Sequence, residues 1–297
     1  MNIVKVYEQF PTNDDCMAHI EKVRWGNTPK CPYCKSDNST PMPKEKRHHC
    51  NNCNTSYSVT VGTIFHHTHL PLQKWFLAIS IILNAKKGIA ARQLGRDLNV
   101  NKDTAWRMAM KIRNAMTQHA QRELLTGIVE ADETYIGGKP RKGNTTKGGN
   151  NKRGRGTKKT PVVGLAERKG KVKAEVFRNK SLNIKNLNAL VRRNVDINNA
   201  TLYTDEYKGY LGIKKFMPHE TVDHTVWYVN GNVSTNTIES FWALLKRGVV
   251  GQYHKVSDRY LPKYIDEFSY RWNHREHDDL FGLTLKRAVK TRDQLLL

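Results

Sequence analysis

Residues 127–138 read GIVEADETYIGG, and this stretch decides the fold class of the second half of the chain. Apolar and polar residues alternate along it, which predicts a β-strand with one face against a core. Glu130 and Asp132 lie two residues apart and therefore share one face of that strand. The strand is thus expected to carry carboxylates beside a buried sheet.

The segments that follow predict a mixed sheet with helices packed on it. Residues 160–179 read as a β-hairpin, and a helix is expected at about 184–195. A short strand, ATLYTD, ends at Asp205, and residues 234–248 (STNTIESFWALLKRG) predict a long helix that holds Glu239. The order strand, hairpin, helix, strand, helix predicts a ribonuclease H-like α/β domain with a mixed sheet.

The carboxylates of Asp132, Asp205 and Glu239 are the candidate catalytic groups of this domain. Asp132 lies near the middle of the first strand and Asp205 at the end of the fourth, so we expect them to be neighbours. A helix that crosses the same edge could add Glu239. Three clustered carboxylates repel one another unless divalent cations neutralise them. Two Mg²⁺ or Mn²⁺ ions held there would activate an attacking oxygen and stabilise the leaving oxygen of a phosphodiester.

Three further acids are weaker candidates for the same site. Glu130 shares the strand face of Asp132 and is a direct rival. Glu133 and Glu206 each follow their aspartate directly, so in a strand they would point to the opposite side.

Glu239 has an alternative role that the sequence leaves open. Asn236 and Glu239 fit a capping box, in which Glu239 would accept a hydrogen bond from the N–H of Asn236. Against this, Lys246 lies seven residues later on nearly the same helix face, which suits a metal ligand followed by a phosphate contact. We therefore expect Lys246, with the adjacent Arg247, to contact DNA.

The charge of the chain predicts a polyanionic partner. Among 297 residues, 50 are Lys or Arg and 27 are Asp or Glu, for a net charge of +23. Such an excess costs stability by self-repulsion and is usually kept for nucleic acid. A membrane is not expected, because the longest apolar run, at 75–85, is too short to span a bilayer. No secretory signal opens the chain. We expect a cytoplasmic, nucleoid-associated protein.

Four cysteines predict a zinc ribbon in the region 1–65. Cys31 and Cys34 form one CxxC pair and Cys50 and Cys53 another, the spacing of a tetrahedral Zn²⁺ site. The basic segment between the pairs buries little apolar surface, so the metal would supply the missing stability. Cys16 has no predicted role. The loop histidines His66, His67 and His69 could form a second metal site, although such residues are usually solvated.

The region 66–122 is predicted to be helical and to hold a helix-turn-helix. In residues 89–116, Asn99–Asn101 would form the turn, and Asn101 would cap the second helix. The side chains expected to face the DNA are Lys102, Thr104, Arg107 and Lys111. An ordinary helical hairpin with a charged solvent face is the alternative.

The segment 138–160 is predicted to be a basic loop. It carries nine Lys or Arg and no acid, and its many Gly and Asn residues disfavour independent folding. Lys152, Arg153 and Arg155 are expected to lie along a phosphate backbone.

Four motifs carry a resemblance to a known family: VEADETYIGGK, LYTDEYKGY, NTIESFWALLKRG and YHKVSDRYLPKYIDEFSYRWNHR. Together they resemble the DDE transposases of bacterial insertion sequences, in particular the ISXO-type subgroup with an N-terminal zinc ribbon. The resemblance implies a DDE catalytic domain at 123–280, followed by a C-terminal tail at 281–297. It implies that Asp132, Asp205 and Glu239 catalyse Mg²⁺-dependent cleavage at transposon ends, followed by strand transfer by the freed 3′-hydroxyl.

The same resemblance implies partners and leaves two rivals. The ribbon and the helix-turn-helix would recognise terminal inverted repeats in double-stranded DNA, and the enzyme would act as a dimer or a higher oligomer. One rival is a catalytically silent DNA-binding regulator derived from a transposase. The other is a ribonuclease H-like nuclease that only hydrolyses. Strand-transfer products would exclude that nuclease, because water cannot form them.

Overall fold

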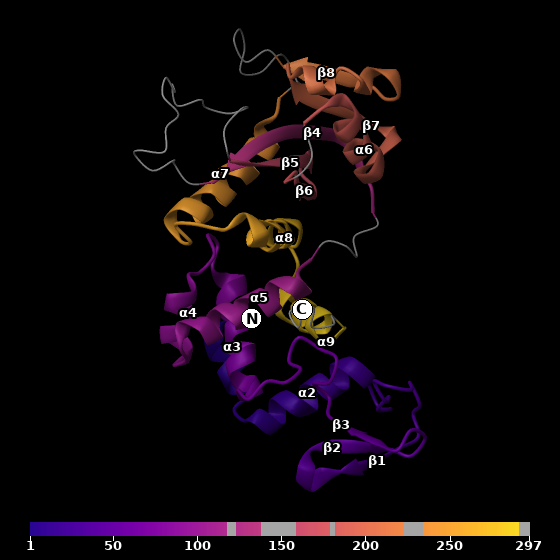
Figure 1. Cartoon of the computed structure of the whole chain (residues 1–297), viewed down its shortest axis with the longest axis vertical. Coiled ribbons are helices and arrows are strands. Elements are labelled where there is room, and N and C mark those ends of the chain that lie inside the picture. The colour runs from indigo at the N-terminus through magenta and orange to yellow at the C-terminus, as the bar shows by residue number, and fades with distance from the viewer. Residues whose placement is uncertain (118–122, 138–158, 179–181, 223–233, 291–297) are drawn as a thin grey trace. The chain divides into compact units, whose positions relative to one another are not determined.

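The computed structural model describes residues 1–117, 123–137, 159–178, 182–222 and 234–290. The chain divides into two compact units, and Figure 1 labels their elements. The first unit contains residues 1–117 and 276–297, and the second contains 118–275. Among the described residues, no helix has the length and apolar character needed to cross a bilayer.

A mixed five-stranded sheet forms the centre of the second unit. Its strands are β4 (Leu125–Ile136), β5 (Thr160–Glu167), β6 (Val172–Val176), β7 (Val195–Asp205) and β8 (His219–Val222), in the order β6-β5-β4-β7-β8. The pairs β4–β5 and β5–β6 are antiparallel, whereas β4–β7 and β7–β8 are parallel. This confirms the predicted mixed sheet, although β7 is longer than the short strand expected.

Helices cover both faces of this sheet, because β4 and β5 alternate their apolar side chains between two cores. Val129, Ala131 and Leu165 pack with α6 (Ile184–Asn194). Ile136 and Val162 pack with α7 (Asn236–Gly251) and α8 (Leu261–Asn273) on the other face. The predicted ribonuclease H-like arrangement of helices on a mixed sheet is therefore confirmed. Short 3₁₀ turns lie at Pro43–Glu45, Lys208–Tyr210, Ile213–Lys215 and Asp258–Tyr260.

The first unit combines a small antiparallel sheet with helices. The sheet consists of β1 (Ser39–Met42), β2 (Arg47–Cys50) and β3 (Thr55–Tyr57). Two helices precede it, α1 (Ile3–Gln9) and α2 (Asn13–Trp25), which the sequence analysis did not anticipate. The start of α2 is fixed by a capping box, in which the Thr12 hydroxyl accepts from the Asp15 N–H and the Asp15 carboxylate accepts from the Thr12 N–H. That pattern is visible in the sequence.

The helical part of the first unit follows the sheet in the chain. It comprises α3 (Leu72–Asn84), α4 (Ala91–Leu98), α5 (Lys102–Ala115) and α9 (Leu280–Lys290). The predicted C-terminal tail is wrong in this respect, because α9 is a helix that packs against α2, α3 and α5. Phe281 and Leu285 are buried in it, so burial of its apolar face accounts for its place in this unit.

Helices α4 and α5 are joined by the predicted three-residue turn. Asn99 adopts the left-handed conformation that ends α4, and the Asn101 side chain accepts a hydrogen bond from the N–H of Thr104 at 2.7 Å. Gly95 lets the helices approach, since a Cβ there would lie 2.9 Å from the carbonyl oxygen of Val100. The local geometry of the hairpin is therefore as predicted, and DNA contact by it stays a prediction.

Candidate active site and metal centre

Asp132 and Asp205 lie side by side on neighbouring parallel strands. Ala131 of β4 pairs with Thr204 of β7, so the next position on each strand is the aspartate. Because paired positions of parallel strands share a face, both carboxylates belong to the face covered by α7. The Asp132 carboxylate also accepts from the N–H of Glu133 at 2.7 Å, which helps to fix its orientation.

Helix α7 brings Glu239 to the same face, and a glycine permits its close approach. Gly164 of β5 is paired with Asp132. A Cβ at Gly164 would lie 2.6 Å from the Trp242 ring and 2.7 Å from Ile238, both on α7. The absence of a side chain at this one position lets the helix lie directly against the strand beside Asp132. Glu239 itself is exposed.

Glu130, the rival metal ligand, instead anchors the start of α7. Its carboxylate is fully buried and accepts from the N–H groups of Thr237 at 2.6 Å and Ile238 at 3.1 Å. It also accepts from the Thr237 hydroxyl at 2.9 Å and from Arg168 Nε at 3.1 Å. Four donors occupy its two oxygens, which makes Glu130 a helix anchor rather than a metal ligand.

The predicted N-cap of α7 is corrected by one residue. Thr235, not Asn236, occupies the N-cap position, and its side chain makes no capping bond. The Thr235 hydroxyl donates instead to the Glu239 carboxylate at 2.9 Å. Amides of the first turn are bound by Glu130, a residue 107 positions earlier in the chain. The N–H groups of Thr237 and Ile238 are thus capped by Glu130, and the alternative role of Glu239 in a capping box with Asn236 is not what holds them.

Electrostatics couple the three candidate acids. Burial is the largest cause that raises the pKa of the Asp132 carboxyl to about 7, followed by the charge of Glu133, while the N–H of Glu133 acts in the opposite direction. The charges of Asp205 and Glu239 raise this pKa further. Both acids therefore act on Asp132 through space, so that ionisation of all three carboxyl groups together is unfavourable.

A cavity of about 750 Å³ opens over Asp132 and Asp205. Lys246 of α7 lines it, as does Lys159 just before β5. Glu239 is not among the lining residues. The further lining residues are Glu133, Thr134, Tyr135, Ile136, Gly137, Val249 and Val250. Three acids and two lysines thus line one hollow, a combination suited to a phosphate group and its metal ions.

Of the two second-choice acids, Glu133 lies on the side that the strand pattern predicted. Glu133 is on the α6 side, where it accepts from the hydroxyl of the buried Tyr210 at 3.3 Å. Glu206 is exposed beyond the end of β7.

The three acids are not gathered as tightly as a preformed metal cage. Within the part of the chain that the structure describes, only the four ribbon cysteines form a set of three or more potential ligands with atoms all within 4.8 Å of one another. A single ion bound by all three acids at once does not match these positions. Two ions, each bound by Asp132 and one other acid, would not require all three carboxylates to lie within reach of one ion.

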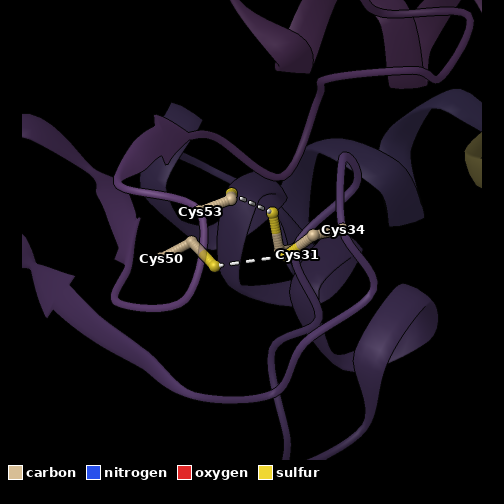
Figure 2. Close-up of side chains that lie close together, drawn as sticks. All are labelled: Cys31, Cys34, Cys50 and Cys53. Carbon is tan, nitrogen blue, oxygen red and sulfur yellow. Dashed lines mark hydrogen bonds between the residues drawn. The ribbon is translucent and has the colours of Figure 1, made fainter.

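The four ribbon cysteines fit a zinc ion. Figure 2 shows their side chains converging from two turns, with Cys31 Sγ 3.7 Å from Cys53 Sγ and Cys34 Sγ 3.5 Å from Cys50 Sγ. A tetrahedron with Zn–S bonds of about 2.3 Å has sulfur–sulfur edges of about 3.8 Å. The N–H of Ser36 is the main cause that lowers the pKa of the Cys34 thiol, to about 6, which favours the thiolate that zinc requires.

The predicted DNA-contacting side chains are placed unequally. Lys102 and Arg107 are exposed on α5, and Thr104 is partly exposed. Lys111 is different, because its ammonium group donates to the carbonyl oxygen of His66 at 3.2 Å. That contact ties α5 to the loop before α3, Lys111 is partly exposed, and its contact with DNA stays a prediction.

The remaining predicted site residues are the helix α7 pair, the basic-loop residues and the loop histidines. Lys246 and Arg247 are exposed on α7. The basic-loop residues Lys152, Arg153 and Arg155 lie outside the described residues. His66 stacks on His67 with ring centroids 3.9 Å apart, and no described group of metal ligands includes them.

The motif YRWNHR at 270–275 has a structural role that the sequence did not reveal. The side chain of Asn273 accepts from the N–H of Val172 at 2.7 Å and donates to its carbonyl oxygen at 2.8 Å. Arg275 donates to the carbonyl oxygens of Lys169 and Gly170. The end of α8 thereby holds the β5–β6 turn, and only the fold brings these partners together.

Two family descriptions match the chain. The ISXO2-like transposase domain matches residues 124–273, and the transposase zinc-ribbon domain matches residues 11–56. The chain belongs to the ISXO2-like transposase family. The zinc-ribbon match covers the four cysteines of the first unit. The matched transposase domain covers the sheet and α6, α7 and α8, and with them Asp132, Asp205 and Glu239.

This transposase-family chain is also similar to one protein of a transposable element and, more distantly, to several solved structures. An uncharacterized protein in transposable element ISH50 of Halobacterium salinarum is 29% identical over 285 residues, covering 92% of each chain. Among solved structures, the Mos1 strand transfer complex aligns at 13% identity over 72% of this chain and 75% of that chain, with a TM-score of 0.33. A simian T-cell lymphotropic virus intasome aligns at 13% identity over 60% and 63%, with a TM-score of 0.29. These two alignments are too loose to carry an argument.

Proposed function

We propose that this chain is an active DDE transposase, in which Asp132, Asp205 and Glu239 hold divalent cations for DNA cleavage and strand transfer. The observation that supports this most is the pairing of β4 with β7, which brings Asp132 and Asp205 to adjacent positions on the face covered by the helix of Glu239. Burial and the charges of Glu133, Asp205 and Glu239 raise the pKa of Asp132, an effect that bound cations would offset. Carboxylate oxygens are the ligands that Mg²⁺ and Mn²⁺ prefer, so the donor set fits such ions.

The cations would supply a nucleophilic oxygen at neutral pH and offset the charge that develops on the leaving oxygen. Asp132 would have to lose its proton to act as a ligand, and Asp205 and Glu239 would supply the other carboxylate oxygens. Lys246 and Lys159 line the cavity and would bind nonbridging phosphate oxygens of the strand that is cut. Thr235 orients the Glu239 carboxylate through its hydroxyl.

The reaction would proceed in two displacements at phosphorus. In the first, water attacks the phosphodiester at a transposon end and a 3′-hydroxyl leaves. In the second, that 3′-hydroxyl attacks a phosphodiester of target DNA and displaces its 3′-oxygen. The same acids and lysines serve both steps, because each step forms one P–O bond and breaks another.

The first unit would position the DNA. We assign Zn²⁺ to Cys31, Cys34, Cys50 and Cys53, where it would hold the ribbon in shape. The exposed face of α5, with Lys102 and Arg107, would contact double-stranded DNA at the transposon ends. Binding of two ends calls for at least a dimer on DNA.

The test uses the full-length protein and labelled duplexes copied from the DNA that flanks its gene on both sides. With Mn²⁺ or Mg²⁺ we expect nicking at one position near each end, and joined products when target DNA is added. Asp132→Asn and Asp205→Asn should reduce cleavage at least about a thousandfold while duplex binding persists, because the acids serve the metal. Glu206→Gln is the matched control, an exposed acid next to Asp205 that should keep full activity.

Each other outcome selects a rival. Binding without metal-dependent cleavage by the wild type would support the silent regulator. Cleavage without joined products would support a hydrolytic nuclease. Full activity of both asparagine variants would remove these acids from the mechanism.

A further inference from the structure

The start of α7 is held by an ion pair with a buried carboxylate, which the proposed chemistry does not use directly. Glu130 of β4 is fully buried, and Arg168, just after β5, pairs with it at 3.1 Å. Arg168 also donates to Ser234 twice, to the carbonyl oxygen at 3.1 Å and to the hydroxyl at 3.0 Å. Its guanidinium lies over the Tyr203 ring, 5.3 Å from the centroid. We call Glu130 and Arg168 together the anchor pair.

The anchor pair grips the chain on both sides of Thr235. Arg168 binds Ser234, and Glu130 binds the amides of Thr237 and Ile238. Thr235 lies between these points, and its hydroxyl donates to the Glu239 carboxylate. The position of Glu239 is therefore set through the residues that the anchor pair holds.

The anchor pair also fixes the position of Glu239 relative to Asp132. Glu130 and Asp132 are two residues apart on β4, about 7 Å along a strand that is paired on both sides. Strand β4 therefore carries both Asp132 and Glu130, the residue that holds the start of α7 and so the helix of Glu239. A shift of the α7 start relative to Asp132 would require the three hydrogen bonds that Glu130 accepts from Thr237 and Ile238 to change.

Stability alone does not account for this arrangement. A buried ion pair pays a desolvation cost, and packed apolar residues of the same volume usually stabilise a fold as well or better. An additional negative charge so near Asp132 is also unfavourable for a site that already holds several acids. A charged pair adds directional hydrogen bonds that an apolar pair lacks. Arg168 and Glu130 bond their partners only in certain positions, so the pair fixes where those partners lie.

We infer that Glu130 and Arg168 are positioning residues that set the divalent-cation affinity of the site through Thr235 and Glu239. This inference rests on the proposed function, because it takes Glu239 to be a metal ligand. Residues that orient metal ligands commonly change metal affinity about tenfold to hundredfold when they are replaced.

The experiment measures Mn²⁺ binding to full-length protein directly, from the electron paramagnetic resonance signal of free Mn²⁺, beside cleavage of the flanking-DNA duplexes. Arg168→Ala should weaken Mn²⁺ binding about tenfold or more. Arg168→Lys should recover part of the loss, since the amine can pair with Glu130 but cannot also hold Ser234 twice. Thr235→Val keeps the anchor pair and the shape of the side chain, and should weaken Mn²⁺ binding without lowering the melting temperature.

The matched control is a second buried ion pair in the same unit. Arg271 pairs with the fully buried Glu267 within α8 at 2.7 Å. Arg271→Ala should lower the melting temperature about as much as Arg168→Ala but leave Mn²⁺ affinity unchanged.

The outcomes separate the two proposals. If the wild type binds Mn²⁺ and cleaves, and the Arg168 and Thr235 variants bind Mn²⁺ as it does, only the positioning role is overturned. Equal losses of Mn²⁺ affinity in the Arg168 and Arg271 variants would also overturn it, because the effect would then follow stability. If Arg168→Ala does not fold, Thr235→Val decides. If the wild type neither binds Mn²⁺ nor cleaves, the proposed function falls and the inference falls with it.

Discussion

Asp132 is a carboxylic acid whose ionisation the fold disfavours. Burial and three neighbouring carboxylates raise its pKa from 3.8 to about 7. The folded protein therefore binds this proton more tightly than the unfolded chain does. In the absence of divalent cations, the contribution of Asp132 to stability falls as the pH rises from about 4 to about 7. Above that window the folded protein carries the full cost of the ionised carboxylate.

Asp132→Asn should consequently stabilise the cation-free protein at high pH. We expect its free energy of unfolding at pH 8 to exceed that of the wild type by about 1–3 kcal/mol, and the difference to shrink toward pH 4. Urea denaturation at both pH values measures this, with Glu206→Gln as a control that should show no pH-dependent gain. A loss of stability at pH 8 in Asp132→Asn would contradict the charge repulsion at the site.

Residue roles were predictable from the sequence only where they follow strand or helix periodicity. The shared face of Asp132 and Asp205 followed from the order of elements, and the capping of α5 by Asn101 followed from local pattern. The role of Glu130 did not, because its partners on α7 lie more than a hundred positions away. A local capping pattern at Glu239 therefore pointed to the wrong residue.

At the scale of elements, the site depends on how closely α7 approaches β5. Gly164→Val would place carbon atoms where the Trp242 ring and Ile238 now lie. We expect a loss of about 1–3 kcal/mol of stability and a larger loss of cleavage, since α7 must move away from Asp132. Gly251→Val is the control, a glycine of the same helix whose added Cβ would meet nothing within 4 Å. Equal cleavage by the two variants would show that the approach at Gly164 is not needed.

The ribbon is the element that most needs a ligand, because its buried core is only Cys31, Cys50 and Tyr57. Cys50→Ser should release zinc, which mass spectrometry of the metal content measures. It should also lower the temperature at which the first unit unfolds. Cys16→Ala removes a buried cysteine outside the cluster and should keep its zinc. Retention of zinc and of the melting profile by Cys50→Ser would refute the zinc site.

Element prediction failed where sequence periodicity did not say which core a helix joins. The pattern of α9 was expected to be a tail, yet its apolar face is buried against α2, α3 and α5. The sequence does not show that α9 belongs to the first unit, because all of the second unit lies between α9 and the rest of the first unit in the chain. Helix α7 was predicted more accurately, because it is long and apolar on one side.

At the scale of the whole molecule, the net charge of +23 should make DNA binding strongly dependent on salt. We expect affinity for flanking-DNA duplexes to fall about a thousandfold or more between roughly 50 mM and 200 mM salt. Replacing Lys102 and Arg107 by alanine should lower the slope of log affinity against log salt by about two. The exposed Lys185 and Lys214, replaced in the same way, serve as the control. A slope unchanged by the first pair would remove α5 from the DNA contact.

The convergence of three acids on divalent cations is the claim on which the enzymatic account depends. A crystal of the full-length protein with Mn²⁺ and flanking DNA tests it through anomalous scattering at the manganese edge. We predict peaks bound by Asp132 and shared with Asp205 and with Glu239. Manganese absent from Asp132, or bound there while Glu239 stays on the Thr235 hydroxyl alone, would contradict the account.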